Sequence, residues 1–239
     1  MKAGMTENVT LHELMDDPSS TAEVMRPILE DLGRINRLTG SVRLVCAYLD
    51  RLLPLWRRSR TSGAPLALLD VATGGADIPR AAARWAARHG VPVRIIALDR
   101  HPVTARLAAE SCAAFPEIEV IRADARALPF GDGAFDACLC SISLHHLEPG
   151  ERPALLRRLD RLGRLGFFVV DLVRSPAAQA GVWLLTRCFR DRLIRTDGPR
   201  SVRRAYSWPE YRALAAGAGI PKLTVRRVPG FRAALERLG

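Results

Sequence analysis

The residues with the most chemical character lie between Asp70 and Asp77, where an apolar run gives way to Val-Ala-Thr-Gly-Gly-Ala. Without side chains at Gly74 and Gly75, the backbone can approach a ligand closely. A glycine-rich turn between a strand and a helix is typical of nucleotide-like cofactor sites. The two flanking carboxylates would repel a diphosphate, so the loop favours a ligand with a positive charge, such as a sulfonium or an ammonium group.

Two further acids follow apolar runs downstream. Asp99 ends the run that begins at Val91, where a carboxylate can accept hydrogen bonds from both hydroxyls of a ribose. Asp124 follows the next run, where an acid can accept an adenine amino hydrogen. A single aspartate at a strand end is more often a turn former or a helix cap. Three such residues at successive strand ends, after one glycine loop, indicate one cofactor site.

His145 and His146 follow a fourth apolar run and are the candidates for proton transfer. The pKa of a histidine lies near neutral pH, so either side chain could act as a general base. One member of such a pair commonly caps the next helix or packs against a cofactor instead. The sequence does not distinguish between the two residues.

The elements that must position these residues alternate along the chain. Apolar runs of strand length are separated by Ala-, Leu- and Arg-rich helical stretches, which predicts an α/β fold with a mostly parallel sheet covered on both faces. The expected strands span residues 66–71, 91–98, 118–121, 134–141 and 166–172, and the expected helices span 79–88, 102–114 and 151–162. Ligands bind outside the carboxyl ends of such strands, which here carry Asp70, Asp99, Asp124, Cys140 with Ser141, and Asp171.

Both ends of the chain add to this core. Residues 10–58 have helical periodicity, and we expect residues 1–62 to form a helical cover or lid over a catalytic domain of residues 63–239. Residues 174–206 predict a helical insert on the substrate side, followed by a helix at 208–216 and a strand at 223–228. The last ten residues fit a strand or a helix equally well.

The net charge and the cysteines limit which classes of partner and site the sequence can support. The net charge is +11, and Lys2 and Lys222 are the only lysines, so arginines threaded singly through helical stretches carry nearly all of it. Such arginines can extend from helix faces, which weakens a nucleic-acid interpretation. The basic last third nevertheless keeps an RNA substrate as an alternative. Cys138 and Cys140 face one side of an expected strand as core residues, and the five cysteines match neither a disulfide framework nor a zinc site.

The sequence shows no apolar segment of the roughly 18–20 residues that a membrane span needs, and its start has no signal-peptide core. We therefore expect a cytoplasmic protein with reduced cysteines.

Taken together, the motifs resemble those of the class I S-adenosylmethionine-dependent methyltransferases over about residues 66–228. "LLDVATGGADI" is similar to the family's glycine loop, "IIALDRHP" to its ribose segment, "RADARALPF" to its adenine segment and "FDACLCSISLHHL" to its fourth-strand motif. The resemblance implies a Rossmann-like, seven-stranded, mostly parallel sheet with helices on both faces. The form "DVATG" looks like the branch, typified by ubiquinone and menaquinone biosynthesis, that methylates quinols and other small aromatic compounds.

The resemblance also implies roles for individual residues. S-adenosylmethionine would be the cofactor, S-adenosylhomocysteine the product, and no metal is expected because the carboxylate cluster of the catechol-type enzymes is absent from the sequence. The implied cofactor-site residues are Asp70, Ala72, Gly74, Gly75, Asp99, Arg100, Asp124, Ala125 and Ser141. Ala72 and Ala76 replace two glycines of the family motif, and we expect binding to survive because an alanine methyl fits where φ is negative.

The predicted substrate is a small, mostly apolar aromatic, quinol or polyketide-like acceptor, with O-methylation favoured over C-methylation. In the insert, an apolar wall would be formed by Trp183, Leu184, Leu185 and Phe189. Arg187, Arg204 and Tyr206 could hold a phenolate or a carboxylate. Two alternatives stay open, an RNA methyltransferase and a non-catalytic module that keeps the cofactor fold. We expect a monomer or a homodimer.

Overall fold

The computed structural model describes residues 19–60, 63–188 and 192–239, with side chains described from Arg195 onward in the last range. Its centre is a seven-stranded sheet in the order β3-β2-β1-β4-β5-β7-β6. Strands β1 to β5 run parallel to one another, and β7 runs antiparallel to both β5 and β6. The strands are β1 Leu66–Val71, β2 Val93–Asp99, β3 Ile118–Arg122, β4 Phe135–Ser141, β5 Gly163–Leu172, β6 Thr224–Val228 and β7 Arg232–Leu238. This is the mostly parallel α/β sheet that the sequence predicts.

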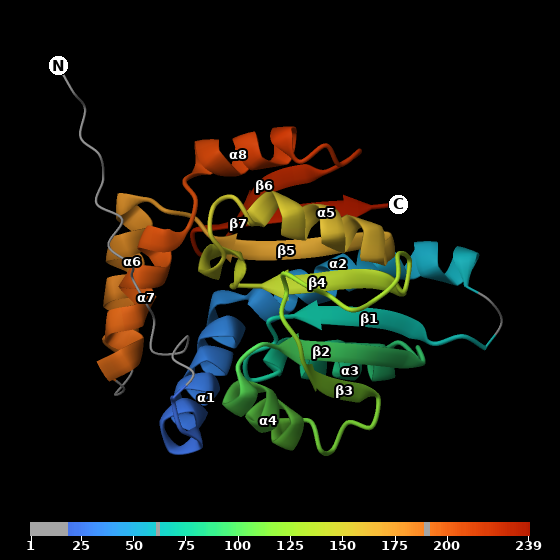
Figure 1. Ribbon diagram of the computed structural model, residues 1–239, viewed down its shortest axis with the longest axis horizontal. Helices are drawn as coiled ribbons and strands as arrows, with labels where there is room; N and C mark the ends of the chain where they lie inside the picture. The colour runs from blue at the N-terminus through green and yellow to red at the C-terminus, as the bar shows by residue number, and fades with distance from the viewer. Residues whose placement is uncertain (1–18, 61–62, 189–191) are drawn as a thin grey trace.

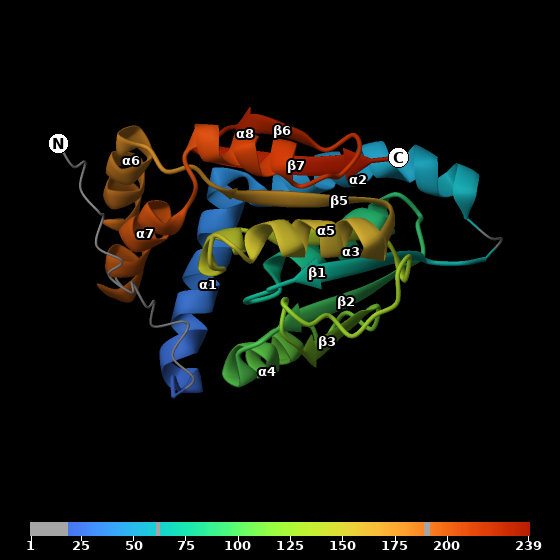
Figure 2. The same ribbon diagram turned by 45° about the horizontal axis from the view of Figure 1, so that its top comes forward.

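Helices cover both faces of the sheet (Figures 1 and 2). One core forms between the sheet and α2, α3 and α4, and a second core forms on the opposite face beneath α5 and α8. The helices are α1 Ala22–Thr39, α2 Ser41–Ser59, α3 Asp77–Arg88, α4 Pro102–Ser111, α5 Arg152–Leu162, α6 Pro176–Thr186, α7 Arg192–Arg204 and α8 Trp208–Gly217, with a short 3-10 turn η2 at Leu144–His146.

The apolar runs of the sequence arise because the central strands are buried on both faces. In β1, Leu66 and Leu68 pack into the core beneath α2 and α3, whereas Leu69 and Val71 pack into the core beneath α5. Both faces of the strand therefore need apolar side chains. The polar residues that remain gather where the strands end.

Helix α1 and the α6–α7 hairpin lie at the carboxyl ends of the parallel strands, away from the two helical layers (Figure 1). Met25 and Leu29 of α1 pack against Leu107 of α4. At Gly40 the backbone is left-handed, with φ 86°, and there the chain turns from α1 into α2. Of the predicted helical cover, residues 1–18 lie outside the described ranges.

The last ten residues, which the sequence assigns to neither a strand nor a helix, contain strand β7, and this strand lies between β5 and β6. Ala233, Ala234 and Leu235 are fully buried between β5 and β6, so sheet pairing rather than local preference decides their conformation. Phe231, which is among these ten residues, precedes the strand, and its side chain is half exposed.

The buried side chain of Arg232, at the start of β7, joins this strand to the α1–α2 junction. Its guanidinium donates hydrogen bonds to the carbonyl of Thr39, to Ser41 Oγ at 2.5 Å and to the carbonyl of Pro229 at 2.9 Å. Burial lowers the pKa of Arg232. The contact with Thr39 spans 193 residues of sequence and fixes the carboxyl end of α1.

Candidate functional site

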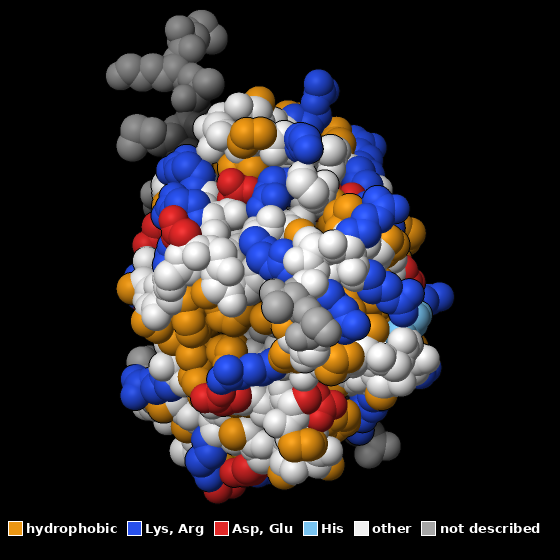
Figure 3. Space-filling view, turned by 90° about the vertical axis from the view of Figure 1, so that its right-hand side faces the viewer, with side chains coloured by type: hydrophobic (Ala, Val, Ile, Leu, Met, Phe, Trp, Pro, Cys, Tyr) orange, Lys and Arg blue, Asp and Glu red, His pale blue; other side chains and the backbone are white. Residues whose placement is uncertain are grey.

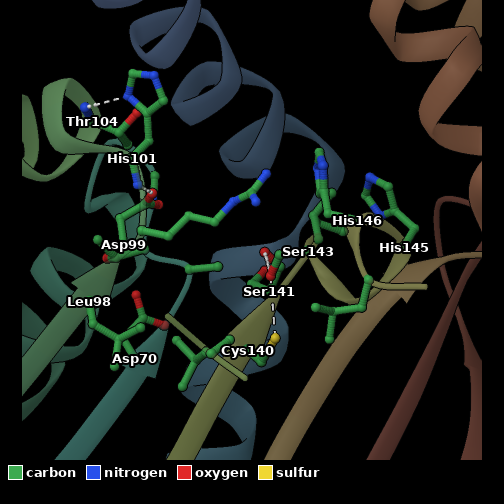
Figure 4. Close-up of a pocket in the computed structure, with 18 of the residues that line it drawn as sticks. Asp70, Leu98, Asp99, His101, Thr104, Cys140, Ser141, Ser143, His145 and His146 are labelled. Carbon is green, nitrogen blue, oxygen red and sulfur yellow. Dashed lines mark hydrogen bonds between the residues drawn. The ribbon is translucent and has the colours of Figure 1, made fainter. Parts of the chain in front are cut away.

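A cavity of about 490 Å³ lies at the carboxyl ends of β1, β2 and β4. In Figure 4, Asp70 and Asp99 lie on one side of this cavity, His145 and His146 lie on the other, and Ser141 and Ser143 lie between them. The structure brings most of the sequence-predicted site residues to its lining: Asp70, Ala72, Gly74, Gly75, Asp99, Arg100, Asp124, Ala125, Ser141, His145, His146 and Arg204.

The loop between β1 and α3 has an unusual backbone. Ala72 and Ala76 both have φ 57°, beside Gly74 at φ 54°. The expectation of a negative φ at the two alanines was therefore wrong, and each carries the left-handed conformation at a cost of about 1–2 kcal/mol. Hydrogen bonds from Thr73 N to the Leu98 carbonyl at 2.8 Å and from Ala76 N to the Thr73 carbonyl at 3.0 Å hold the loop in this shape.

Gly75 allows α1 to approach the same loop. A Cβ atom at this position would lie 3.3 Å from both the Cβ and the carbonyl oxygen of Leu29. Leu29, Leu32 and Asn36 of α1 also line the cavity. Asn36 Nδ2 donates to the two carboxylate oxygens of Asp77 at 3.4 and 3.2 Å, so α1 and the glycine loop form one wall.

Asp99 organises the loop from the end of β2. Its Oδ2 accepts a hydrogen bond from Gly74 N at 3.1 Å, and its Oδ1 accepts one from His101 N at 3.0 Å. Burial raises the pKa of Asp99, and these two hydrogen bonds act in the opposite direction. Each carboxylate oxygen has a second lone pair that a ligand can use.

Several buried polar atoms in the cavity wall lack a partner within the described part of the chain. They are Asp70 Oδ2, Thr73 Oγ1 and Ser141 Oγ. Burial raises the pKa of Asp70 to about 7. Buried polar groups are normally hydrogen-bonded, so these three atoms fit a polar, positively charged ligand that is held between β1 and β4.

Asp124, after β3, is less buried and already paired. Its carboxylate accepts hydrogen bonds from the backbone and the guanidinium of Arg126, the shortest being 2.6 Å to Nη2. The pKa of Asp124 is lowered, chiefly by this hydrogen bonding to Arg126. Asp124 can therefore accept a hydrogen bond from a ligand only with the lone pairs that Arg126 does not use.

His145 is held by a carboxylate behind it. His145 Nδ1 lies 2.6 Å from Asp171 Oδ1, and the backbone N of His145 donates to Asp171 Oδ2 at 2.7 Å. Both side chains are buried. Burial alone would raise the pKa of Asp171, but His145 and the backbone hydrogen bonds hold it below its ordinary value. Since Asp171 engages Nδ1, Nε2 is the ring nitrogen that this carboxylate leaves unused.

His146 lies beside this pair, and its ring centroid is 4.4 Å from that of His145. The η2 turn that carries both residues is fixed from α5 and α7. Arg152 donates to the carbonyls of His145 at 3.3 Å and Leu147 at 3.0 Å, and Arg204 donates to the carbonyl of His146 at 3.0 Å. Arg204 thus reaches the cavity while it supports the turn.

The other substrate-side residues predicted from the sequence do not line the cavity. Trp183 is 49% exposed on α6, and the Arg187 guanidinium lies 4.2 Å from its ring centroid. The Tyr206 hydroxyl donates to the Pro149 carbonyl at 3.1 Å. Phe189, also predicted for the apolar wall, lies outside the described residues.

Sequence reasoning left three contributors unassigned. Asp171 was visible as an acid at a strand end, but its partner His145 lies 26 residues away. Asn36 and Arg152 carry no local signal, because their contacts depend on how α1 and α5 pack. Cys138 and Cys140, by contrast, are buried in one core as predicted, and burial raises the pKa of Cys140 to about 12.

The structure also bears on three other kinds of feature: a metal site, a membrane-spanning helix and a basic surface patch. Among residues 19–60, 63–188 and 192–239, no group of three or more His, Cys, Asp or Glu side chains could hold a metal ion. The same ranges contain no helix long and apolar enough to cross a membrane. In Figure 3, Lys and Arg side chains are dispersed over one face among apolar and acidic ones.

Comparison with known proteins gives one sequence match. Residues 68–166 match the family profile described as a methyltransferase domain. This range runs from β1 into β5 and includes the glycine loop, Asp99, Asp124 and both histidines. No curated protein matches the sequence significantly.

Solved structures share the fold. A SAM-dependent methyltransferase from Aquifex aeolicus is 18% identical with a TM-score of 0.54, covering 85% of this chain and 95% of its own. An O-methyltransferase family protein from Burkholderia thailandensis has 17% identity, a TM-score of 0.65 and coverage of 95% and 62%. The DszA carbon methyltransferase has 12% identity, a TM-score of 0.66 and coverage of 91% and 60%.

Proposed function

We propose that this chain, which belongs to the class I S-adenosylmethionine-dependent methyltransferases, methylates the oxygen of a small, mostly apolar aromatic acceptor such as a phenol or a quinol. The observation that carries the proposal is the buried His145–Asp171 pair, whose histidine lines the cavity on the side opposite Asp99.

The cavity lining fits the cofactor. Asp99 would accept the ribose hydroxyls, Asp124 and Ala125 would border the adenine, and the unpartnered oxygens of Asp70 and Ser141 would receive the polar methionine end. When bound, S-adenosylmethionine supplies an electrophilic methyl group on a sulfonium. The carboxylates of Asp70 and Asp99 match this positive charge.

His145 would act as the general base. Its Nε2 would accept the proton of the acceptor hydroxyl, which makes that oxygen the nucleophile for the methyl group. Asp171 fixes the tautomer and the ring orientation of His145 and stabilises the imidazolium that forms. A positioned base of this kind contributes about 10²–10⁴-fold in rate.

The cavity also limits the acceptor. Its volume of about 490 Å³ has to hold the cofactor together with the acceptor, so the acceptor must be small. Leu32, Ile142 and Leu147 give the lining an apolar character. Within the basic last third, Arg174, Arg200, Arg226 and Arg237 each pair with an acid, which favours a small molecule over RNA.

Helix α1 would serve as the lid of this site, with residues 1–62 as the helical cover and 63–239 as the catalytic domain. The support is its packing on Gly75 and its hydrogen bonds to Asp77 at the cavity wall. Closing a lid excludes water from the transfer site.

The test is a methyl-transfer assay with a panel of phenols and quinols that differ in acidity. We expect His145→Gln to lower kcat by about 10²–10⁴-fold on a weakly acidic phenol, and by far less on a dinitrophenol, which is already ionised at neutral pH. The His146→Gln variant, the matched control, should show no such dependence on acidity. Asp171→Asn should behave like His145→Gln, with the affinity for S-adenosylhomocysteine retained.

An equal loss for all acceptors in His145→Gln would contradict the role of base and leave His145 as a packing residue. The position of the new methyl group, assigned by NMR of the product, decides between oxygen and carbon. Failure of every phenol and quinol, with cofactor binding intact, would overturn the proposed acceptor class.

A further inference from the structure

A second hollow, which we call the α2–α3 groove, lies behind the glycine loop on the far side of Asp77. It has a volume of about 160 Å³ and is lined by four arginines, Arg37, Arg80, Arg84 and Arg88, together with Cys46 and Asp77. Asp77 also lines the large cavity, so the two sites share one wall.

The arginines reach the groove because of helix geometry. Arg80, Arg84 and Arg88 follow one another at four-residue spacing on α3, which places them on one face of the helix. This face meets α2, and Arg37 joins it from the last turn of α1. Two elements, α1 and α3, therefore supply positive charge to one small space, and α2 forms its uncharged side.

Little within the described chain neutralises these charges. Arg80 donates to the Ser111 carbonyl at 3.3 Å, and Arg84 lies 5.0 Å from the centre of the Phe115 ring. Arg37 and Arg88 form no ion pair with the described residues. Of the groove's lining, Asp77 is the single carboxylate; it accepts hydrogen bonds from Asn36 and offsets one of the four positive charges.

The lining residues other than the arginines and Asp77 carry no negative charge that would repel an anion. Burial raises the pKa of Cys46, with Arg88 opposing, so the thiol is neutral at physiological pH. Asp50, one turn further along α2, accepts a hydrogen bond from Trp85 Nε1 at 2.7 Å and does not line the groove. Planar guanidiniums match the oxygens of a phosphate in pairs, and four arginines against one carboxylate give the groove a net positive charge that attracts a compact dianion.

We infer that the α2–α3 groove is a binding site for a phosphate group, either the free ion or a phosphate monoester whose organic part extends into solvent. The small volume accommodates a phosphate and excludes a whole nucleotide. The site is separate from the cofactor cavity and does not depend on the identity of the methyl acceptor.

The test is calorimetric titration of the full chain with inorganic phosphate and, separately, with phenyl phosphate, at constant ionic strength. Saturating S-adenosylhomocysteine is present so that phosphate cannot enter the large cavity. We expect saturable binding of one phosphate group per chain. Tighter binding of the inorganic ion would identify the free ion as the ligand type, and tighter binding of phenyl phosphate would identify a monoester.

The informative variant is Arg37→Gln/Arg88→Gln, since both side chains are exposed and unpaired and their removal leaves the packing intact. It should weaken binding at least 10-fold. The control Arg57→Gln/Arg58→Gln removes the same charge from the exposed end of α2 and should stay within twofold of the unchanged protein. The absence of saturable binding, or an equal loss in both variants, would overturn the inference.

Discussion

Asp70 and Asp171 show how strongly a partner decides the state of a buried carboxylate. Both lie near the ends of central strands and both are buried. Asp171 has His145 beside it, which holds its pKa below the ordinary value, whereas Asp70 has an unpartnered oxygen and a pKa raised to about 7. The unpaired charge sits where a cationic ligand would bind.

The first prediction at this scale concerns stability without cofactor. Between its ordinary pKa of 3.8 and about 7, the native Asp70 holds a proton that the unfolded chain releases, so Asp70 makes stability fall as the pH rises through this window. The full shift corresponds to about 4 kcal/mol. Asp70→Asn should therefore stabilise the cofactor-free protein, and the gain should grow from pH 5 to pH 8 in urea unfolding.

The other raised carboxyls, Asp77 and Asp99, are present in both proteins, so the difference between variant and parent isolates Asp70. A gain of the same size at both pH values would show that Asp70 is ionised throughout. The same variant should bind S-adenosylmethionine more weakly, because the carboxylate charge is lost.

At the scale of elements, the glycine loop combines function with strain. Ala72 occupies a conformation that suits glycine, at φ 57°. Ala72→Gly should raise the free energy of unfolding by about 0.5–1 kcal/mol, which is the relief of left-handed strain less the extra entropy of glycine in the unfolded chain. Ala81→Gly, inside α3, should lower it by about 0.5–1 kcal/mol. Denaturant unfolding measures both changes in the free energy of unfolding. A loss of stability in both variants would contradict the strain at Ala72.

The α1–α2 junction depends on Arg232. Arg232→Met leaves the carbonyls of Thr39 and Pro229 without their donor, at about 1–3 kcal/mol for each group that stays buried. We expect a loss of about 2–4 kcal/mol and faster hydrogen exchange in α1 than in α5. The control Arg226→Met removes a half-exposed guanidinium from Glu236, which keeps its ion pair with Arg51, and should cost under about 1 kcal/mol. Unchanged exchange in α1 would show that the junction holds without Arg232.

The elements themselves were largely predictable, because apolar runs that alternate with helical stretches specify a doubly covered parallel sheet. The strand-end acids Asp70, Asp99 and Asp124 were found for the same reason. Three features were not predictable, since each depends on contacts that span tens of residues: the conformation of Ala72, the partner of His145 and the secondary structure of the last strand. The placement of Trp183 failed similarly, because helical periodicity does not say which face of α6 meets the cavity.

At the scale of the whole molecule, the cavity links segments that are far apart in the chain. A ligand in it contacts α1, the glycine loop, β4 and α7 together. S-adenosylhomocysteine at 100 times its Kd should therefore stabilise the protein by about 2.7 kcal/mol, which raises the melting temperature by roughly 5–10 °C.

This shift should vanish in Asp99→Ala and persist in Glu30→Ala, which removes one negative charge from the exposed face of α1. Thermal unfolding followed by circular dichroism measures both. A shift that survives in Asp99→Ala would place the ligand elsewhere.

The order of β5, β7 and β6 in the sheet has a consequence for synthesis on the ribosome. Strand β6 pairs with β7 and reaches the rest of the sheet through it, although β7 is made later. The cavity residues from Asp70 to Arg204 thus leave the exit tunnel before residues 232–238 can close the sheet and before Arg232 can fix α1. A nascent chain of which about the first 220 residues have emerged would have the cavity floor without an anchored α1, so firm cofactor retention should begin only when β7 has emerged.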